Sequence, residues 1–301
     1  MKRIADTQYI LNFDENNPPV ARVSSGETIV FSCMDCFHNQ MDSASVLKSN
    51  LLQDGMVINP VAGPVYIEGA MPGDTLKVRL DDVEITRDFG TFSINQFDFR
   101  AVKQHITEEE GAAIPIEDGF VNLFDGKLQL PVRLNVGVLG VAPKGEPIST
   151  LQPGAFGGNL DCKHFTKGTT MYLPVFVEGA LLAAGDIHAL QSDGEMPCAL
   201  EVPGNITVTV ELIKGRQEAW PVLETDDAWY VITAALTSDE ANMTAAGAMA
   251  DFLVRRSDMY EPKEWAILLA MAGDLEICQV ANPWVAIRYK MPKSVTKDMV
   301  F

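Results

Sequence analysis

The chain is short of positive charge. Its 23 lysines and arginines stand against 41 aspartates and glutamates, which gives a formal net charge of −18 over 301 residues. A surface of that sign repels phosphate backbones and anionic lipid headgroups. We therefore expect neither a nucleic-acid partner nor a membrane partner, and a small neutral or cationic molecule suits such a surface better.

The sequence also lacks long apolar runs. None approaches the roughly 18 residues that a membrane-spanning helix requires. The first twenty residues, MKRIADTQYILNFDENNPPV, become acidic early and are not expected to be a signal peptide. The cysteines are an odd, scattered set, for which reduced thiols in the cytoplasm are the simplest account. They are Cys33, Cys36, Cys162, Cys198 and Cys278.

Three common catalytic motifs are missing. There is no GxxxxGK[ST] loop for nucleotide phosphates and no GxGxxG opening a helix. The GxSxG elbow that presents a nucleophilic serine is absent as well. Metal-activated water is the strongest catalytic interpretation that remains.

Short apolar segments between turn residues indicate a mainly β fold over the first two hundred residues. Strands are predicted at Thr28–Cys33, within Asp74–Ile85, whose residues alternate in polarity, and at Asn205–Ile213. Within Phe120–Val132, the pair Asp125-Gly126 predicts a two-residue β-hairpin turn. Many short strands of this kind are typical of a β-sandwich or a barrel.

An internal repeat suggests that this body consists of two related β units. Residues 64–74 read PVYIEGAMPGD, and residues 174–186 read PVFVEGALLAAGD. Each has an apolar strand, then Glu-Gly-Ala, then a connection that ends in Gly-Asp. Pseudo-symmetric halves would explain the similarity, although the vocabulary of strands and turns is small enough to repeat by chance.

The pattern changes after about residue 220. A strand over Trp229–Leu236 is followed by a helix with Ser238 at its N-cap, and by a second helix that Pro262 opens and Gly273 ends. A last β run, VAIRYKM, closes the segment. We expect a β-rich, metal-binding body over residues 1–220 and a smaller α+β portion over 221–301 packed on it.

The densest group of candidate functional residues lies between residues 157 and 195. Asp186 and His188 are two positions apart in a predicted strand, so their side chains leave on one face. The following turn returns Asp193 and Glu195, and Asp161 follows a Gly-Gly-Asn turn. One imidazole with several carboxylates is a natural site for a divalent cation, above all zinc. Alternatively, the Gly-Asp and Asp-Gly pairs are ordinary turns and the histidine is structural.

A second group is Cys33-Met34-Asp35-Cys36-Phe37-His38. No second CxxC accompanies it, which argues against a structural zinc site. Cys36 near His38 could act as a nucleophile with its base, although a free cysteine is more often a small buried apolar residue. We favour Asp35 as a carboxylate at a strand end that reaches the metal.

Several stretches resemble the acetamidase/formamidase family. They are GPVYIEGAMPGDTL (63–76), VGVLGVAP (136–143), FGGNLD (156–161), VEGALLAAGDIHALQSDGE (177–195) and AGDLEICQVANP (272–283). The GGNxD and GDxHAxQxDGE motifs are specific when they occur together. Ser192 departs from the family, which usually carries glycine there, so the turn can differ.

The resemblance implies a hydrolase that splits the C–N bond of short carboxamides, such as formamide or acetamide, into a carboxylate and ammonia. It also implies a β-rich fold with a smaller α+β portion and a homo-oligomer, a dimer or higher. It does not identify the amide.

Our hypothesis for the mechanism uses the residues of both groups. Zinc would be held by Asp35, Asp161, His188 and Asp193, and would activate a bound water. Glu195 would transfer the proton of that water to the departing nitrogen, and Asp186 would orient His188 or complete the ligand set. The roles of Glu195 and Asp193 could be exchanged.

Two alternatives stay open. A non-catalytic β-sandwich binding protein could hold a structural cation, and calcium suits carboxylate ligands. A cysteine-nucleophile amidase would instead use Cys36 and need no metal.

Overall fold

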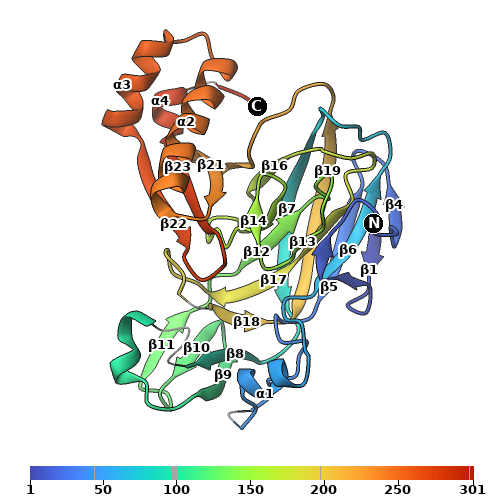
Figure 1. The fold of residues 1–301 in the computed structure, drawn as a ribbon, viewed down its shortest axis with the longest axis vertical. Helices are drawn as coiled ribbons and strands as arrows, with labels where there is room; N and C mark the ends of the chain where they lie inside the picture. Colours follow the sequence, from blue (N-terminus) through green and yellow to red (C-terminus); the bar gives the residue numbers. More distant parts are fainter. Residues whose placement is uncertain (44, 96–99, 197, 298) are drawn as a thin grey trace.

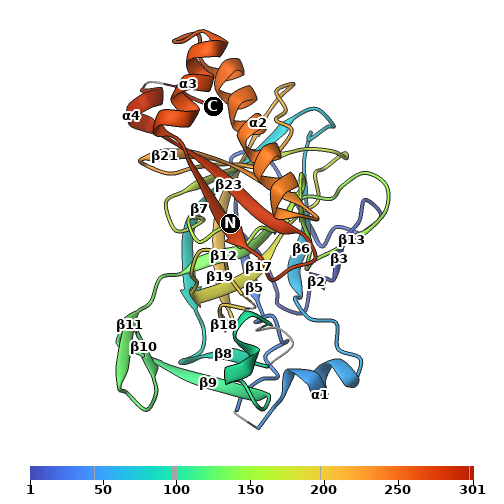
Figure 2. The same cartoon turned by 60° about the vertical axis from the view of Figure 1, so that its left-hand side comes forward.

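The computed structural model describes residues 1–43, 45–95, 100–196, 198–297 and 299–301. Two large sheets dominate these residues, and the C-terminal helices gather at one end of the molecule, whereas the short helix at Lys48–Gln53 lies at the opposite end (Figures 1 and 2). The predicted mainly β fold with helices near the C-terminus is therefore confirmed.

The first sheet has nine strands. In spatial order they are β1 (Lys2–Ile4), β5 (Thr28–Cys33), β19 (Gly204–Ile213), β7 (Thr75–Ile85), β16 (Thr170–Pro174), β20 (Val222–Glu224), β21 (Ala228–Ala235), β23 (Val285–Pro292) and β22 (Asp274–Gln279). Strand β19 pairs antiparallel with both β5 and β7. In β7 the alternating Leu76, Val78 and Leu80 are fully buried, which is the pattern predicted from the sequence.

The second sheet has twelve strands and carries the candidate site. Its main path runs β11 (Leu128–Pro131), β10 (Phe120–Leu123), β9 (Glu110–Glu117), β8 (Phe89–Ile94), β18 (Leu200–Val202), β17 (Leu182–Leu190), β12 (Asn135–Gly140), β15 (Gly157–Asn159) and β14 (Pro153–Gly154). Off this path, β6 (Val61–Ile67) pairs with β17, β2 (Tyr9–Ile10) and β4 (Ala21–Val23). The predicted hairpin is confirmed as β10 and β11. A separate small sheet joins β3 (Asn12–Phe13) to β13 (Ile148–Ser149).

Strand β17 lies at the centre of the molecule because it pairs with three neighbours. It is antiparallel to β12, β18 and β6, and all its residues from Leu182 to Ala189 are buried. Its burial explains why most of its residues are alanine, leucine or isoleucine. The charged residues within it are therefore exceptions that need a specific partner.

The N-cap of helix α2 (Ser238–Arg256) lies one residue earlier than predicted. The N-cap is Thr237, whose side chain accepts a hydrogen bond from the Glu240 backbone N–H. Ser238, predicted as the N-cap, is instead the first helical residue. Both residues have a hydroxyl that can cap a helix, so the choice depends on the backbone conformation.

The other helices are shorter. They are α1 (Lys48–Gln53), the 3-10 helix η1 (Arg100–His105), α3 (Pro262–Ala272) and α4 (Lys293–Thr296). As predicted, Pro262 opens α3 and Gly273 ends it. Among the described residues, none of the helices combines the length and hydrophobicity that a membrane crossing requires.

The C-terminal residues extend the first sheet and add a second core. Strands β20 and β21 continue it from β16 across residue 220, while α2 and α3 pack on β21 and β23. Trp229, Phe252 and Trp265 lie in a hydrophobic cluster distinct from the main one. A division of the chain near residue 220 stays a prediction.

The two Glu-Gly-Ala segments of the internal repeat lie against each other. The Ile67 N–H donates to the Gly179 carbonyl, and the Gly179 N–H donates to the Ala70 carbonyl, each at 2.9 Å. The repeated segments thus join β6 and the approach to β17 at one place in the core. Their common origin stays a prediction.

Candidate active site

Strand β17 supplies two residues of the candidate site. Its register with β12 places His188 opposite Asn135 and Ile187 opposite Val136. Asp186 and His188 are 4% and 1% exposed. Buried charged groups persist only when they have partners, so both residues must serve a polar site.

The ring of His188 is surrounded by carboxylates. Its Nε2 atom lies 3.4 Å from Asp186 Oδ2, 3.5 Å from Glu201 Oε1 and 3.9 Å from Asp161 Oδ1. Glu195 is also buried, and its negative charge contributes to raising the pKa values of Asp161 and His188. We call these five residues, Asp161, Asp186, His188, Glu195 and Glu201, the carboxylate–histidine cluster. The structure thus brings four of the six predicted site residues together.

The cluster rests on a glycine of β12. A Cβ atom added to Gly137 would lie 2.5 Å from Asp186 Oδ2, 2.6 Å from Asp161 Oδ1 and 2.8 Å from His188 Cε1. Any side chain at this position would therefore displace the cluster. The Gly137 carbonyl also accepts from the Asp161 N–H at 3.1 Å, which ties the Asp161 loop to the strand.

Replacing Gly137 by alanine should lower activity by about 100-fold, because a displacement of reacting groups by about 1 Å has an effect of that size. The measurement is kcat/KM on a short amide beside the thermal midpoint. The matched control is Gly247→Ala on α2, where an added Cβ meets nothing within 4 Å. Equal activities of the two variants would contradict the role of Gly137.

Two acidic residues of the cluster adopt a left-handed backbone conformation. Asp161 has φ of 47° and Asp186 has φ of 61°. This region costs free energy for residues other than glycine and is enriched at functional sites. The surrounding strands hold both residues in place, so their carboxylates are pre-positioned.

Side-chain amides surround the carboxylate of Asp161. Asn282 Nδ2 donates to Asp161 Oδ2 at 2.9 Å. Asn159, in the amide orientation that its partners require, donates to both Asp161 oxygens at 3.0 Å and to Asp186 Oδ2 at 3.3 Å. These amides come from β15 and from the β22–β23 connection, so the site joins segments that are far apart in sequence.

Gln191 links several parts of the cluster. Its Nε2 donates to Glu195 Oε2 at 2.5 Å and to the Asp161 carbonyl at 3.0 Å. Its Oε1 accepts from Asn135 Nδ2 at 2.6 Å, and that nitrogen lies 3.3 Å from His188 Nδ1. The far nitrogen of His188 therefore faces Asn135, whereas Asp186 contacts the nitrogen on the cluster side.

Burial and charge shift the pKa values in the cluster. Burial, with the nearby charge of Asp186, raises the pKa of Glu195. Burial likewise raises the pKa of Asp161 and Glu201, and neighbouring carboxylates add to it. Burial alone would lower the pKa of His188, but the charges of Glu201 and Asp186 outweigh it and raise that pKa. A divalent cation would relieve this concentration of negative charge.

The sequence analysis missed Glu201. This residue of β18 is 2% exposed, and its Oε2 atom has no hydrogen-bond partner. The only signal was a single charge within the apolar run ALEVP. The pairing of β18 with β17, which sets Glu201 opposite His188, brings it to the site.

Asp35 is fully buried but faces other partners. Its Oδ2 accepts from Arg87 Nη2 at 2.8 Å, and its Oδ1 accepts from the backbone N–H groups of Phe37 and Asn39. Among the described residues, Asp35 belongs to no group of three potential ligands. Asp35 is therefore placed to hold the loop that carries Cys36.

Asp193 belongs to a separate group of charged side chains beside the cluster. Its carboxylate pairs with the buried Arg288 at 2.8 Å and with Lys163 at 2.6 Å. Burial would raise the pKa of Asp193, but these two cations lower it. Arg288 also pairs with Glu276 at 2.6 Å. Asp193 thus anchors the turn that carries Glu195, and the structure does not bring it to His188.

Cys36 lies at the cluster, but His38, its predicted base, does not contact it. Its Sγ atom groups with Asp186 and Glu201, with all ligand atoms within 4.8 Å. Burial, with the charges of Glu201 and Asp186, raises its pKa well above the ordinary 9.0 of a thiol. His38 instead contacts the Val57 carbonyl and packs on Tyr9. These surroundings oppose the thiolate that a nucleophile requires.

The four acidic residues of the cluster line a small cavity of about 170 Å³, whereas His188 is not among the lining residues. Its lining includes these four acidic residues, one lysine, three asparagines and several apolar residues: Asp161, Asp186, Glu195, Glu201, Lys48, Asn59, Asn159, Asn282, Phe37, Ile58, Leu151 and Pro283. Such a mixture suits a small polar molecule with a short apolar end.

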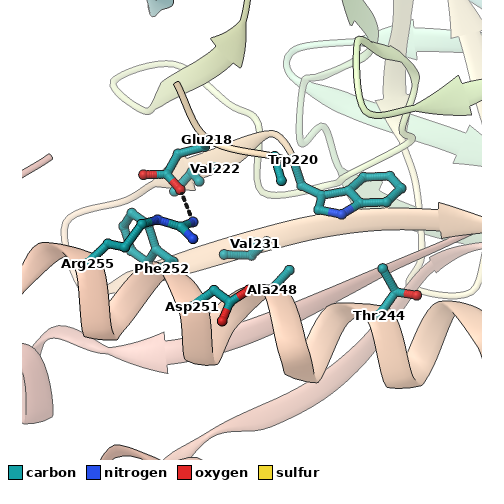
Figure 3. A pocket seen from close by; sticks show the side chains of 10 residues that line it. Glu218, Trp220, Val222, Val231, Thr244, Ala248, Asp251, Phe252 and Arg255 are labelled. Atoms are coloured by element: carbon teal, nitrogen blue, oxygen red, sulfur yellow. Dashed lines mark hydrogen bonds and ion pairs between the residues drawn. The ribbon is translucent and has the colours of Figure 1, made fainter. Parts of the chain in front are cut away.

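A second cavity, of about 250 Å³, lies between α2 and the strands β20 and β21 (Figure 3). Trp220 and Phe252 contribute to its walls, and Glu218 pairs with Arg255 at 2.5 Å within it. Glu218 also pairs with Arg256, so its charge is compensated by two arginines. The cavity offers no counterpart of the carboxylate–histidine cluster.

The fold and the site together define a β-rich protein with a buried acidic centre for a small ligand. The chain belongs to the acetamidase/formamidase family, whose model matches residues 4–148 and 141–231. The resemblance noted in the sequence is thereby confirmed.

Solved structures of relatives share the whole fold. An acetamidase from Bacillus halodurans is similar with a TM-score of 0.93 and 35% identity, over 99% of this chain and 100% of that one. A predicted acetamidase/formamidase from Thermoanaerobacter tengcongensis has a TM-score of 0.90 and 33% identity, over 99% and 97% of the two chains.

Two named relatives match over shorter spans. An acetamidase of Mycolicibacterium smegmatis is 49% identical over 75 residues, which are 24% of this chain and 18% of the relative. A formamidase of Methylophilus methylotrophus is 28% identical over 256 residues, or 65% and 62% of the two chains. The matched regions therefore cover less than two thirds of either relative.

Proposed function

We propose that this protein is a metal-dependent amidohydrolase that cleaves short carboxamides to a carboxylate and ammonia. The observation that carries the proposal is the buried carboxylate–histidine cluster, whose four acidic residues line a cavity of about 170 Å³. Family membership supports the reaction class, and the cavity supports a small substrate such as formamide or acetamide.

The cluster residues fit a divalent cation. Ligand atoms of Asp161, Asp186 and His188 all lie within 4.8 Å of one another, and the unpartnered Glu201 Oε2 offers a further oxygen. Three oxygens and one imidazole nitrogen suit zinc, although calcium also accepts such carboxylates. We therefore assign the ligand role to Asp161, Asp186 and His188, with Glu201 as a fourth candidate. When bound, the ion would lower the pKa of a water and polarise the amide carbonyl.

Glu195 is the proposed general base. It lines the cavity, and Gln191 holds its Oε2 in place. Its raised pKa brings it closer to neutrality, which is where a base that also returns a proton works best. Glu195 would take the proton of the attacking water and deliver it to the nitrogen of the leaving group, which leaves as ammonia.

Alternative functions predict different behaviour. A binding protein with a structural cation would gain stability from the metal and release no ammonia. A Cys36 amidase would lose activity on Cys36→Ala and survive chelation. The raised pKa of Cys36, and the contacts of His38 with Val57 and Tyr9 rather than with Cys36, favour the metal-dependent function.

An ammonia-release screen tests the proposal. The protein is incubated with formamide, acetamide and larger linear amides before and after metal removal, then again after zinc or calcium is restored. We expect release from the short amides only, loss on chelation and recovery with one ion. Release that chelation leaves unchanged would contradict metal dependence, and no release from any amide would contradict the function.

We also propose that the protein is cytoplasmic and forms a homo-oligomer, a dimer or higher. The five cysteines are all free, which suits a reducing compartment. Light scattering of the purified protein measures the subunit number.

A further inference from the structure

Besides Glu201 Oε2, which is a candidate metal ligand, a second polar atom of the cavity lining has no hydrogen-bond partner. Asn59 lines the cavity beside Asp161 and Glu195, and it is 2% exposed. Its Oδ1 atom is buried and accepts no hydrogen bond. A buried acceptor that lacks a donor costs free energy, so such an atom in a native site calls for a ligand.

The backbone of Asn59 is held on both sides. Its N–H donates to the Cys36 carbonyl at 2.8 Å, and its own carbonyl accepts from the Thr150 hydroxyl at 2.8 Å. The residue adopts a left-handed conformation with φ of 68°. Asparagine tolerates this conformation, which is a structural reason for its presence, but that reason does not require the side-chain oxygen.

The side chain of Asn59 is oriented as well. Its Nδ2 donates to Asn159 at 3.3 Å, and Asn159 in turn donates to the carboxylates of Asp161 and Asp186. A half-turn of the Asn59 amide would set its oxygen against the oxygen of Asn159. The network therefore keeps the Asn59 nitrogen as the donor to Asn159 and leaves the oxygen as an acceptor for the ligand.

The missing partner is a hydrogen-bond donor on the substrate. A primary carboxamide carries two N–H donors, whereas the ester of the same acid has none at that position. We propose that Asn59 Oδ1 accepts an N–H of the substrate carboxamide, and that it is the residue by which this site selects amides over esters. This inference rests on the amidohydrolase function proposed above.

The size of the effect follows from the unmade bond. An ester in the native site would leave Asn59 Oδ1 unpaired, and sites built to bond a donor reject analogues that lack it. Removing the acceptor should therefore lower kcat/KM for acetamide by about 10- to 100-fold. The rate for methyl acetate should stay unchanged or rise.

The test compares Asn59→Gly and Asn59→Leu with the wild type on acetamide and methyl acetate. Glycine keeps the left-handed backbone and removes the acceptor, so it separates recognition from folding. Asp118→Gly is the matched control, because Asp118 also has a positive φ, of 50°, and lies in an exposed turn. Where ester turnover is below detection, the inhibition constant of the ester replaces its kcat/KM.

We expect the ratio of amide to ester to collapse in both Asn59 variants, with an unchanged ratio in Asp118→Gly. Equal losses for amide and ester, as a bond from Asn59 to the attacking water would produce, overturn the inference and leave the proposed function intact. An unchanged amide rate in Asn59→Gly overturns it too. If the wild type releases no ammonia from any amide, the function and the inference both fail.

Discussion

Glu195→Gln is expected to lower kcat by about 10²- to 10⁴-fold, the usual contribution of a general base, with little change in KM. Glutamine keeps the size of the side chain, and its amide oxygen can still accept from Gln191 Nε2, as Glu195 Oε2 does at 2.5 Å. The variant therefore removes the basic oxygen and preserves the packing. Steady-state ammonia release measures it.

The pH profile gives a second measure of the same role. Burial raises the pKa of Glu195 above its ordinary 4.5, so the ionised base is lost as the pH falls through that raised value. The midpoint of the acid limb in the pH profile of kcat/KM should therefore lie at a higher pH than the midpoint expected for an exposed glutamate. Gln191→Met removes an N–H that favours the ionised form, which should shift this limb to higher pH.

A matched control is Glu178→Gln. Glu178 is exposed and accepts from the Tyr66 hydroxyl at 2.6 Å, outside the cavity lining. Its activity should equal that of the wild type. A Glu195→Gln enzyme with more than a tenth of the wild-type kcat would be inconsistent with general-base catalysis by this residue.

The second large effect is expected from His188→Ala, which should remove bound metal and activity together. The imidazole is the only nitrogen ligand in the group formed with Asp161 and Asp186. A metal that binds only the native state stabilises it in proportion to the logarithm of its concentration, so the variant should also lose the thermal stabilisation by added zinc. Elemental analysis and thermal melts measure both.

This stabilisation should depend on pH with a definite sign. The pKa values of the Asp161, Glu195 and Glu201 carboxyls and of the His188 imidazole are raised, so the metal-free native state holds more protons than the unfolded chain. The free energy of unfolding of the metal-free protein should then fall as the pH rises from about 5 to about 8. Metal binding displaces these protons, so the gain from zinc should grow over the same range.

His164→Ala is the control for metal binding. His164 forms a separate potential ligand group, with Asp193 and Glu276. We expect this variant to keep its metal, because Arg288 already neutralises both of those carboxylates. A normal metal content in His188→Ala, or a loss of metal in His164→Ala, would contradict the assignment of the metal site to the cluster.

Local sequence pattern was sufficient for most secondary structure. The strand predicted at Thr28–Cys33 has those bounds in the structure, and the hairpin around Asp125-Gly126 is also present. Alternating polarity and turn residues report directly on whether a strand is half-buried and where it reverses. The N-cap of α2 is Thr237 and not the predicted Ser238, because both residues carry a hydroxyl that can cap the helix.

Spacing along the chain was informative for the site only within one element. Asp186 and His188 share a face because a strand has a period of two, and the structure brings them together. Asp193 lies only five residues beyond His188, yet it pairs with Arg288 from the other end of the chain. Proximity in sequence across a turn does not determine which way a side chain points.

The sequence by itself determined the mainly β fold, the family, and the strand that carries an acid and an imidazole on one face. These follow from local periodicity and from motifs written in consecutive residues. Only the tertiary structure decided that Glu201 belongs to the site, that Gly137 leaves room for the cluster, and that Asn59 lines the cavity and has an unpaired oxygen. Strand pairing sets such contacts, and it joins residues that no local pattern relates.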